Sequence, residues 1–177
     1  MTCYFFSTRV GKSRVLWENL EIPTLPVKYQ MFQGATALNL DAKGRLAVPT
    51  RHRDALQSGN GSKQVLTAHP HRCLLLYPAP AWEPIRARIM GFSSFDPQTS
   101  LWKRLLVGFA EEVELDASGR LLVSPELRKF AGLEKQVMMV GQGTHFEIWN
   151  QSTWEKQLEQ LAAGGDKLPP GLENFAL

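Results

Sequence analysis

Residues 40–48 read LDAKGRLAV, and 75 positions later residues 115–123 read LDASGRLLV. Seven of these nine positions are identical, so the chain contains two copies of one turn. A second correspondence aligns residues 65–82 with residues 137–154 at an offset of 72. Repeated units of this size bury their apolar faces by packing against one another, which predicts two copies of a module of roughly fifty residues.

The repeated turn has the composition of a hairpin loop. Residues 36–40 alternate apolar and polar side chains, residues 45–48 form a short β-prone stretch, and the sequence DAKG at residues 41–44 lies between them. We therefore expect a hairpin in which Gly44 occupies the left-handed region and Asp41 accepts hydrogen bonds from the backbone of its own turn. The equivalent residues of the second copy are Asp116 and Gly119.

Each copy continues with the same predicted elements in the same order. A proline, Pro49 or Pro125, opens a short helix, two strands follow, and a helix near a repeated tryptophan ends the copy. The predicted ranges are 50–56, 64–68, 73–77 and 82–90 in the first copy, and 126–130, 136–140, 145–149 and 153–161 in the second. One copy has too few apolar positions to close a core, so the two are expected to enclose one small barrel.

These elements divide the chain into five expected segments. Residues 35–82 and 111–154 form the two modules, and residues 83–110 form a helical linker whose amphipathic part spans residues 101–109. Residues 155–177 are expected to form a C-terminal helix and tail. Residues 1–30 are interpreted as a leader of unassigned function, which a start codon further upstream would explain.

The composition favours a folded, soluble protein. Hydrophobic residues make up 44% of the chain and charged residues 21%, which excludes wholesale disorder and collagen-like repetition. The chain has two cysteines, Cys3 and Cys73, in unlike contexts, which is typical of a reducing cytoplasm. No apolar run approaches the 18 or so residues of a membrane span, and the first thirty residues lack a signal-peptide core. We expect a cytoplasmic protein.

The net charge of +3 conceals an uneven distribution. Residues 31–90 hold eight basic and three acidic side chains, whereas residues 91–150 hold six and eight. A single Asp-x-x-x-Arg turn would be interpreted as a salt-bridged surface hairpin. Its repetition, within a basic first half of the chain, favours a surface that faces a polyanion, because a guanidinium on a stiff turn bonds well to phosphate or to guanine edges.

The sequences MFQGA at residues 31–35 and LDAKGRLAVPTRHR at residues 40–53, with the second turn at residues 116–120, closely resemble the MraZ family of bacterial transcription regulators. The resemblance covers residues 31–177. It implies two tandem SpoVT/AbrB-type modules, mainly β with short helices (α+β), interlocked as a swapped-hairpin β-barrel and assembled into a homo-oligomeric ring. It also implies sequence-specific binding to short direct repeats in double-stranded promoter DNA. The regulated operon would be the protein's own, in the division and cell-wall gene cluster, with the protein associated with the nucleoid.

The family motif, carried over to this sequence, assigns Arg45 as the leading DNA contact. The candidate DNA-binding residues are Arg45, Lys43, Arg51, Arg53 and Arg120, of which Arg51 and Arg53 would clamp phosphates from the following helix. The residues expected to orient the turns are Asp41, Gly44, Asp116 and Gly119. The second turn has Ser118 in place of Lys43, and Glu126 in place of Arg51. We therefore expect the second turn to make a subsidiary contact or to pack subunits together.

Other chemistries are less well supported. His69, His71 and Cys73 are spaced two residues apart, so on a strand they would share one face and could bind zinc. However, Pro70 interrupts the strand and the second copy lacks the set. No activated nucleophile or phosphate-binding loop is present, so we expect no catalysis, no cofactor, no metal and no small-molecule substrate. The repeat-equivalent tryptophans could stack on bases, yet their positions at helix starts favour core packing.

Two other functions remain as alternatives to the regulator. The first is an AbrB-type antidote whose main role is to bury a partner protein, with DNA binding secondary. Such antidotes carry a separate partner-binding tail, whereas here two modules fill most of the chain and the tail comprises only residues 164–177. The second is a structural ring subunit without DNA affinity, whose binding would not depend on salt or on Arg45.

Overall fold

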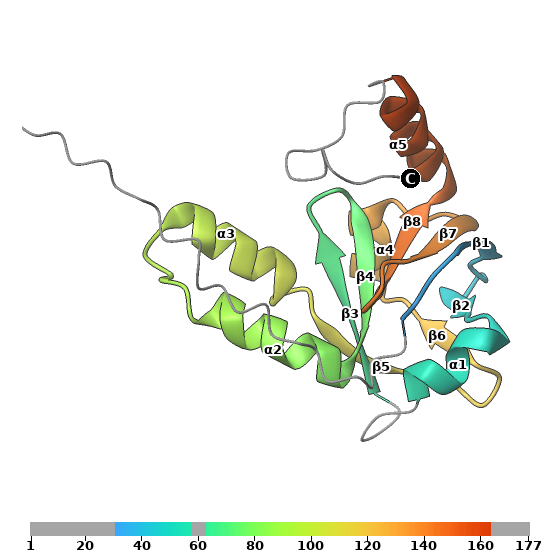
Figure 1. Cartoon of the computed structure of the whole chain (residues 1–177), viewed down its shortest axis with the longest axis horizontal. Coiled ribbons are helices and arrows are strands. Elements are labelled where there is room, and N and C mark those ends of the chain that lie inside the picture. Colours follow the sequence, from blue (N-terminus) through green and yellow to red (C-terminus); the bar gives the residue numbers. More distant parts are fainter. Residues whose placement is uncertain (1–30, 58–62, 164–177) are drawn as a thin grey trace, which may run out of the picture.

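The computed structural model describes residues 31–57 and 63–163, which fold mostly as strands with several short helices (Figure 1). The strands are β1 (Ala35–Asn39), β2 (Arg45–Ala47), β3 (Lys63–His69), β4 (Cys73–Pro78), β5 (Glu111–Glu114), β6 (Arg120–Leu122), β7 (Gln136–Gly141) and β8 (Phe146–Asn150). The helices are α1 (Thr50–Gln57), α2 (Ala79–Met90), α3 (Pro97–Leu106), α4 (Pro125–Ala131) and α5 (Gln151–Ala163). None of these helices is both long enough and apolar enough to cross a membrane. The predicted leader, residues 1–30, and the end of the predicted tail, residues 164–177, lie outside the described residues.

Strands are exchanged between the two repeats. The larger sheet is antiparallel in the order β1-β7-β8-β4-β3-β5, so β1 of the first repeat pairs with β7 of the second, and β5 pairs with β3. A separate two-stranded ribbon joins β2 to β6. The predicted hairpin between residues 36–40 and 45–48 is therefore wrong beyond its turn, where Leu40 and Leu46 form one isolated bridge. Pairing between the repeats is favoured over the local hairpin because it buries Leu46 completely against the other repeat.

An approximate two-fold axis relates the repeats. Leu46 lies opposite Leu121 at the centre of the ribbon, and these residues are equivalent at the offset of 75. In the larger sheet β4 pairs with β8 with Leu75 opposite Glu147, which are equivalent at the offset of 72. Both pairings place equivalent residues face to face, as a two-fold axis through the two sheets requires. The two repeats thus share both the larger sheet and the ribbon.

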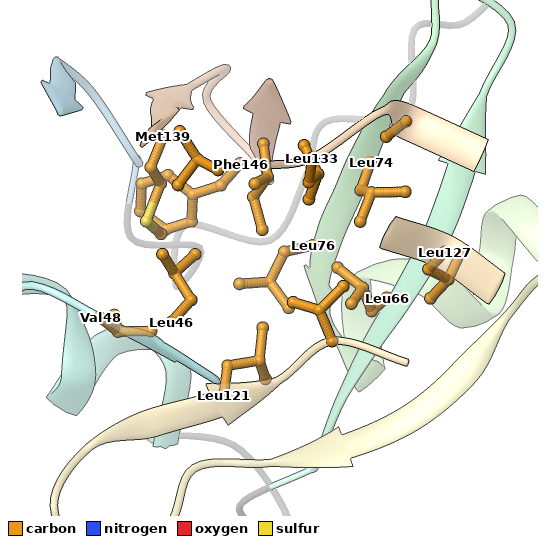
Figure 2. Packing of buried hydrophobic residues seen from close by; sticks show 14 of the residues in the cluster. Leu46, Val48, Leu66, Leu74, Leu76, Leu121, Leu127, Leu133, Met139 and Phe146 are labelled. Atoms are coloured by element: carbon orange, nitrogen blue, oxygen red, sulfur yellow. The ribbon is translucent and has the colours of Figure 1, made fainter. Parts of the chain in front are cut away.

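The central strand β4 is buried on both faces, which accounts for its nearly continuous apolar sequence CLLLYP. Leu74 and Leu76 point toward the ribbon and form the main core with leucines of β2, β6 and α4 (Figure 2). Cys73, Leu75 and Tyr77 point to the opposite face. The fold therefore has three layers: the ribbon with α1 and α4, the six-stranded sheet, and the helices α2, α3 and α5.

The repeated tryptophans pack against the sheet at helix starts. Trp82 of α2 is buried with Tyr77 at a ring separation of 5.6 Å, and half-buried Trp154 of α5 lies 5.9 Å from Trp149. This confirms core packing over base stacking. Helix α2 begins at Ala79, before the predicted 82, because Pro80 is accommodated in its first turn.

The predicted amphipathic segment 101–109 is displaced in the structure. Helix α3 begins at Pro97, because the Asp96 side chain caps it by accepting a 2.6 Å hydrogen bond from the Thr99 backbone N–H. Helix α2 and helix α3 lie side by side and extend from the sheet as a helical pair (Figure 1).

Candidate nucleic-acid interface

The first repeated turn is closed by the Asp41 side chain. Its Oδ1 accepts hydrogen bonds of 2.9 Å from the backbone N–H groups of Lys43 and Arg45. The Gly44 N–H donates to the Asp41 carbonyl at 2.9 Å, and Gly44 has φ +80°. The left-handed conformation and the capping role predicted for this turn are both confirmed. Because three backbone bonds converge on one aspartate, the turn presents the residues that follow it on a stiff support.

The Arg45 guanidinium is held by Asp41 along its Nε edge. Its Nε donates to Asp41 Oδ2 at 2.7 Å, and the side chain is 29% exposed. Among residues 31–57 and 63–163, nothing accepts a hydrogen bond from its two Nη groups. The aspartate therefore fixes the direction of the guanidinium and leaves its outer N–H groups available to an incoming acceptor. This arrangement suits bidentate bonding to a phosphate or a guanine edge.

The second turn repeats this geometry. Asp116 Oδ1 accepts from the N–H groups of Ser118 and Arg120, both at 2.9 Å, and Gly119 has φ +72°. Arg120 approaches Asp116 Oδ2 with both Nε at 2.8 Å and Nη2 at 2.7 Å. In both turns the hydrogen bond that holds the guanidinium runs from Nε to the aspartate Oδ2, so the two arginines are oriented in the same way.

The pKa values of both capping carboxylates are lowered, so both are ionised at neutral pH. Hydrogen bonds from the side chain and the backbone of Arg120 lower the pKa of Asp116 from 3.8 to about 2. Hydrogen bonds from the backbone and the side chain of Arg45, with that of the Lys43 N–H, also lower the pKa of Asp41. At neutral pH each turn therefore carries a closed carboxylate–guanidinium pair.

This pair predicts a pH dependence of stability. A lowered pKa in the folded state means that the stabilisation from ionised Asp116 is complete above about pH 4 and disappears as the pH falls toward 2. We expect wild type and Asp116→Asn to differ in melting temperature at pH 6, and the difference to shrink between pH 4 and pH 2. Thermal unfolding across that range measures it, and a difference independent of pH would contradict the assignment.

The ribbon presents a regular outward face. Leu46 and Leu121 point inward and are fully buried, so their neighbours in β2 and β6 point toward solvent. In the register of the ribbon, Arg45 lies opposite Leu122 and Ala47 lies opposite Arg120. The two arginines thus occupy diagonal positions on one exposed two-stranded surface. A two-stranded β-ribbon is one of the elements that the major groove of B-DNA admits.

The structure separates the basic residues that the sequence placed together. The Val48 N–H donates to the Gly119 carbonyl at 3.0 Å, so α1, which follows Val48, lies beside the second turn. Arg53 Nε donates to the Val48 carbonyl at 2.8 Å. Arg51 Nη2 donates to Thr36 Oγ1 of β1 at 2.8 Å. Neither arginine joins Arg45 in one cluster, because strand exchange carries α1 to the far end of the ribbon.

The residue that does lie beside the first turn is Arg128 of α4, which sequence reasoning missed. The Val123 N–H donates to the Gly44 carbonyl at 2.9 Å and brings α4 to this end. A Cβ atom built on Gly44 would lie 2.8 Å from Arg128 Cζ. Arg128 is equivalent to Arg53 at the offset of 75, so the repeat itself contained the signal.

The His69, His71 and Cys73 candidates occupy the β3–β4 turn. The two imidazole rings meet edge to face at 4.7 Å, and Cys73 is buried with Val140 and Trp149. Burial raises the pKa of the Cys73 thiol far above its usual value, which disfavours the thiolate that binds metals. Within the described ranges, no three His, Cys, Asp or Glu side chains are grouped as a metal site would require.

Comparison with known proteins gives one consistent family. The family model described as "MraZ protein, putative antitoxin-like" matches residues 31–105 and residues 106–166. The transcriptional regulator MraZ of Methylobacillus flagellatus is 66% identical over 148 residues, which are 83% of this chain and the whole of that protein. The proteins of the same name from Aromatoleum aromaticum and an Azoarcus species are 62% and 60% identical over 148 residues, with the same coverage of both chains.

Proposed function

We propose, since this chain belongs to the MraZ family, that it is a transcriptional regulator that binds double-stranded promoter DNA in a sequence-specific manner. The observation that supports DNA binding most directly is the outward face of the β2–β6 ribbon. It carries two arginines, each oriented by an aspartate of its own turn. Because the aspartates hold the guanidiniums in place, little side-chain entropy is lost when DNA is bound.

Within this surface the roles differ between the two turns. Arg45 reads base edges, because its Nη groups have no acceptor among the described residues, and the exposed Lys43 beside it contacts a phosphate. Arg120 makes a subsidiary contact, because the second copy has Ser118 in place of Lys43 and Glu126 in place of Arg51. Arg51 adds a phosphate contact from α1. The operator is a set of short direct repeats in the promoter of the protein's own operon, within the division and cell-wall gene cluster, as the family resemblance implies.

The same proposal includes a closed swapped-hairpin unit and its assembly into a homo-oligomeric ring. The exchange of strands between repeats supports the swapped-hairpin unit. Exposed apolar side chains at the α2–α3 pair support the ring: Phe95, in the connection between the two helices, is 99% exposed, and Phe92 of the same connection lines a hollow of about 300 Å³ with Trp102 of α3. Sedimentation at micromolar concentration measures the assembly. A mass equal to that of one chain would contradict the ring.

The DNA-binding proposal predicts a difference between equivalent arginines. We expect Arg45→Ala to weaken binding to a fragment from upstream of the protein's own gene by about 10- to 100-fold, and Arg120→Ala by less, since a bidentate base contact contributes about 1–3 kcal/mol. Fluorescence anisotropy over a salt series measures both. The wild-type binding constant should fall steeply with salt as counterions are released.

Arg88→Ala is the matched control, since it removes the same charge from an exposed position on α2, in the layer on the other side of the sheet. It should change affinity by less than about twofold. Equal losses of DNA affinity in Arg88→Ala and Arg45→Ala would mean that net charge alone accounts for the effect. A wild type that does not distinguish the promoter from a scrambled fragment would reject the operator and favour the partner-binding antidote instead.

A further inference from the structure

We propose that Arg53 and Arg128 are positioning residues, each of which supports the DNA-reading turn of the opposite repeat. The helix of the second repeat would hold the turn that carries Arg45, and the helix of the first repeat would hold the turn that carries Arg120. The effect on DNA rests on the proposed function, but the support of the turns is a property of the free protein. Arg53 would then act on DNA through Gly119 and Arg120 and not as a phosphate clamp.

The first contact joins Arg128 to Gly44. A Cβ atom at Gly44 would lie 2.8 Å from Arg128 Cζ, 2.9 Å from its Nε and 3.1 Å from its Nη1. The guanidinium therefore occupies the place that a side chain at Gly44 would fill. Gly44 directly precedes Arg45 and closes the turn through its N–H. The Arg128 guanidinium consequently braces the backbone from which Arg45 projects.

The second contact is its counterpart at the other end of the ribbon. A Cβ atom at Gly119 would lie 2.3 Å from both Cζ and Nε of Arg53. Arg53 Nε also donates to the Val48 carbonyl at 2.8 Å, while the Val48 N–H donates to the Gly119 carbonyl at 3.0 Å. Val48 is thus bonded to the second turn through its N–H and to Arg53 through its carbonyl. This makes a closed connection between α1 and the second turn.

These contacts explain why neither arginine is well placed as a phosphate clamp. Both side chains are half-buried, and the guanidinium of each lies against a turn glycine. The Nε of Arg128 is buried with no hydrogen-bond partner among the described residues, so its contribution at Gly44 is one of packing. A flexible lysine would supply the same charge, whereas filling the space beside a glycine requires the flat guanidinium group.

The crossed arrangement predicts a crossed response in the free protein. We expect Arg128→Ala to speed hydrogen exchange of the Gly44 amide by about tenfold and that of Gly119 by less than twofold, with the reverse pattern for Arg53→Ala. Exchange measured by NMR on the full chain reads both amides separately. Lys129→Ala, an exposed neighbour of Arg128 on α4, is the control and should change neither amide. Perturbation of each variant's own turn, or of both turns equally, would overturn the proposal.

A double-mutant cycle on promoter DNA tests the consequence for binding. We expect Arg128→Ala to weaken affinity about tenfold in the wild-type background, about tenfold in Arg120→Ala, and less than about threefold in Arg45→Ala. Its salt slope should stay equal to that of the wild type, because no phosphate contact is lost. A slope lower by about one, with Gly44 exchange unchanged, would make Arg128 a phosphate contact and reject the positioning role.

The two proposals fail in distinguishable ways. If the wild type does not bind DNA but the crossed exchange pattern is present, the function is wrong and the positioning contacts stand. Should the alanine variants not fold, Arg53→Lys and Arg128→Lys keep the charge and the aliphatic stem. A positioning role predicts that these lysine variants still show the crossed exchange pattern, whereas a phosphate clamp predicts near wild-type affinity and exchange.

Discussion

Replacing Gly119 by alanine should destabilise the protein by about 2–4 kcal/mol. Part of this cost, about 1–2 kcal/mol, is the left-handed conformation at φ +72°, which a Cβ atom disfavours. The remainder arises because the new methyl group would lie 2.3 Å from Arg53 Cζ, which forces the guanidinium to give up its bond to the Val48 carbonyl. Urea unfolding at fixed protein concentration measures the loss.

Gly132→Ala is the matched control for this substitution. Gly132 ends α4 with φ +59°, and a Cβ atom there would meet nothing within 4 Å. It should cost only the backbone strain of about 1 kcal/mol. In an Arg53→Ala background the cost of Gly119→Ala should fall to the same value, because the obstructing side chain is gone. Equal costs for the two glycines in the wild type would mean that Arg53 does not constrain the second turn.

The local features of the fold could be predicted from the sequence. Asp41 and Gly44 specify their turn by themselves, since an aspartate accepting from the next N–H groups and a glycine with positive φ are local requirements. Proline likewise marks the starts of α1 and α4 within one residue. These features depend on neighbouring residues only, so they can be predicted without knowing which strands pair.

Strand pairing could not be predicted from the local pattern of residues, because it is decided at long range. The alternation in residues 36–40 fits a hairpin with residues 45–48 equally well as pairing with β7, and only the burial of Leu46 against the second repeat separates the two. The same limit applies to the site, because the sequence does not show that α1, with Arg51 and Arg53, lies beside the second turn. The repeat offered a partial remedy, since the equivalence of Arg53 and Arg128 indicates two matching contacts, though not that they cross.

The centre of the ribbon joins the two repeats. Leu121 has no exposed surface and belongs to the same core cluster as Leu46 of β2, Leu66 of β3 and Leu76 of β4 (Figure 2). Its neighbour Leu122, on the same strand, points outward and is 56% exposed. Two leucines one residue apart therefore experience opposite environments, as a period of two along a strand requires.

Leu121→Ala should accordingly cost about 3–5 kcal/mol, because the lost side chain leaves a cavity between ribbon and sheet that neither layer can close. Leu122→Ala deletes the same atoms from a solvent-exposed position, so its free energy of unfolding should stay within about 0.5 kcal/mol of the wild-type value. Urea midpoints of the two variants at one protein concentration measure the difference. Because Leu121 faces Leu46 across the approximate two-fold axis, Leu46→Ala should match Leu121→Ala closely. Comparable losses for Leu121→Ala and Leu122→Ala would show that the ribbon does not pack on the sheet in solution, and the diagonal arginine surface would lose its support.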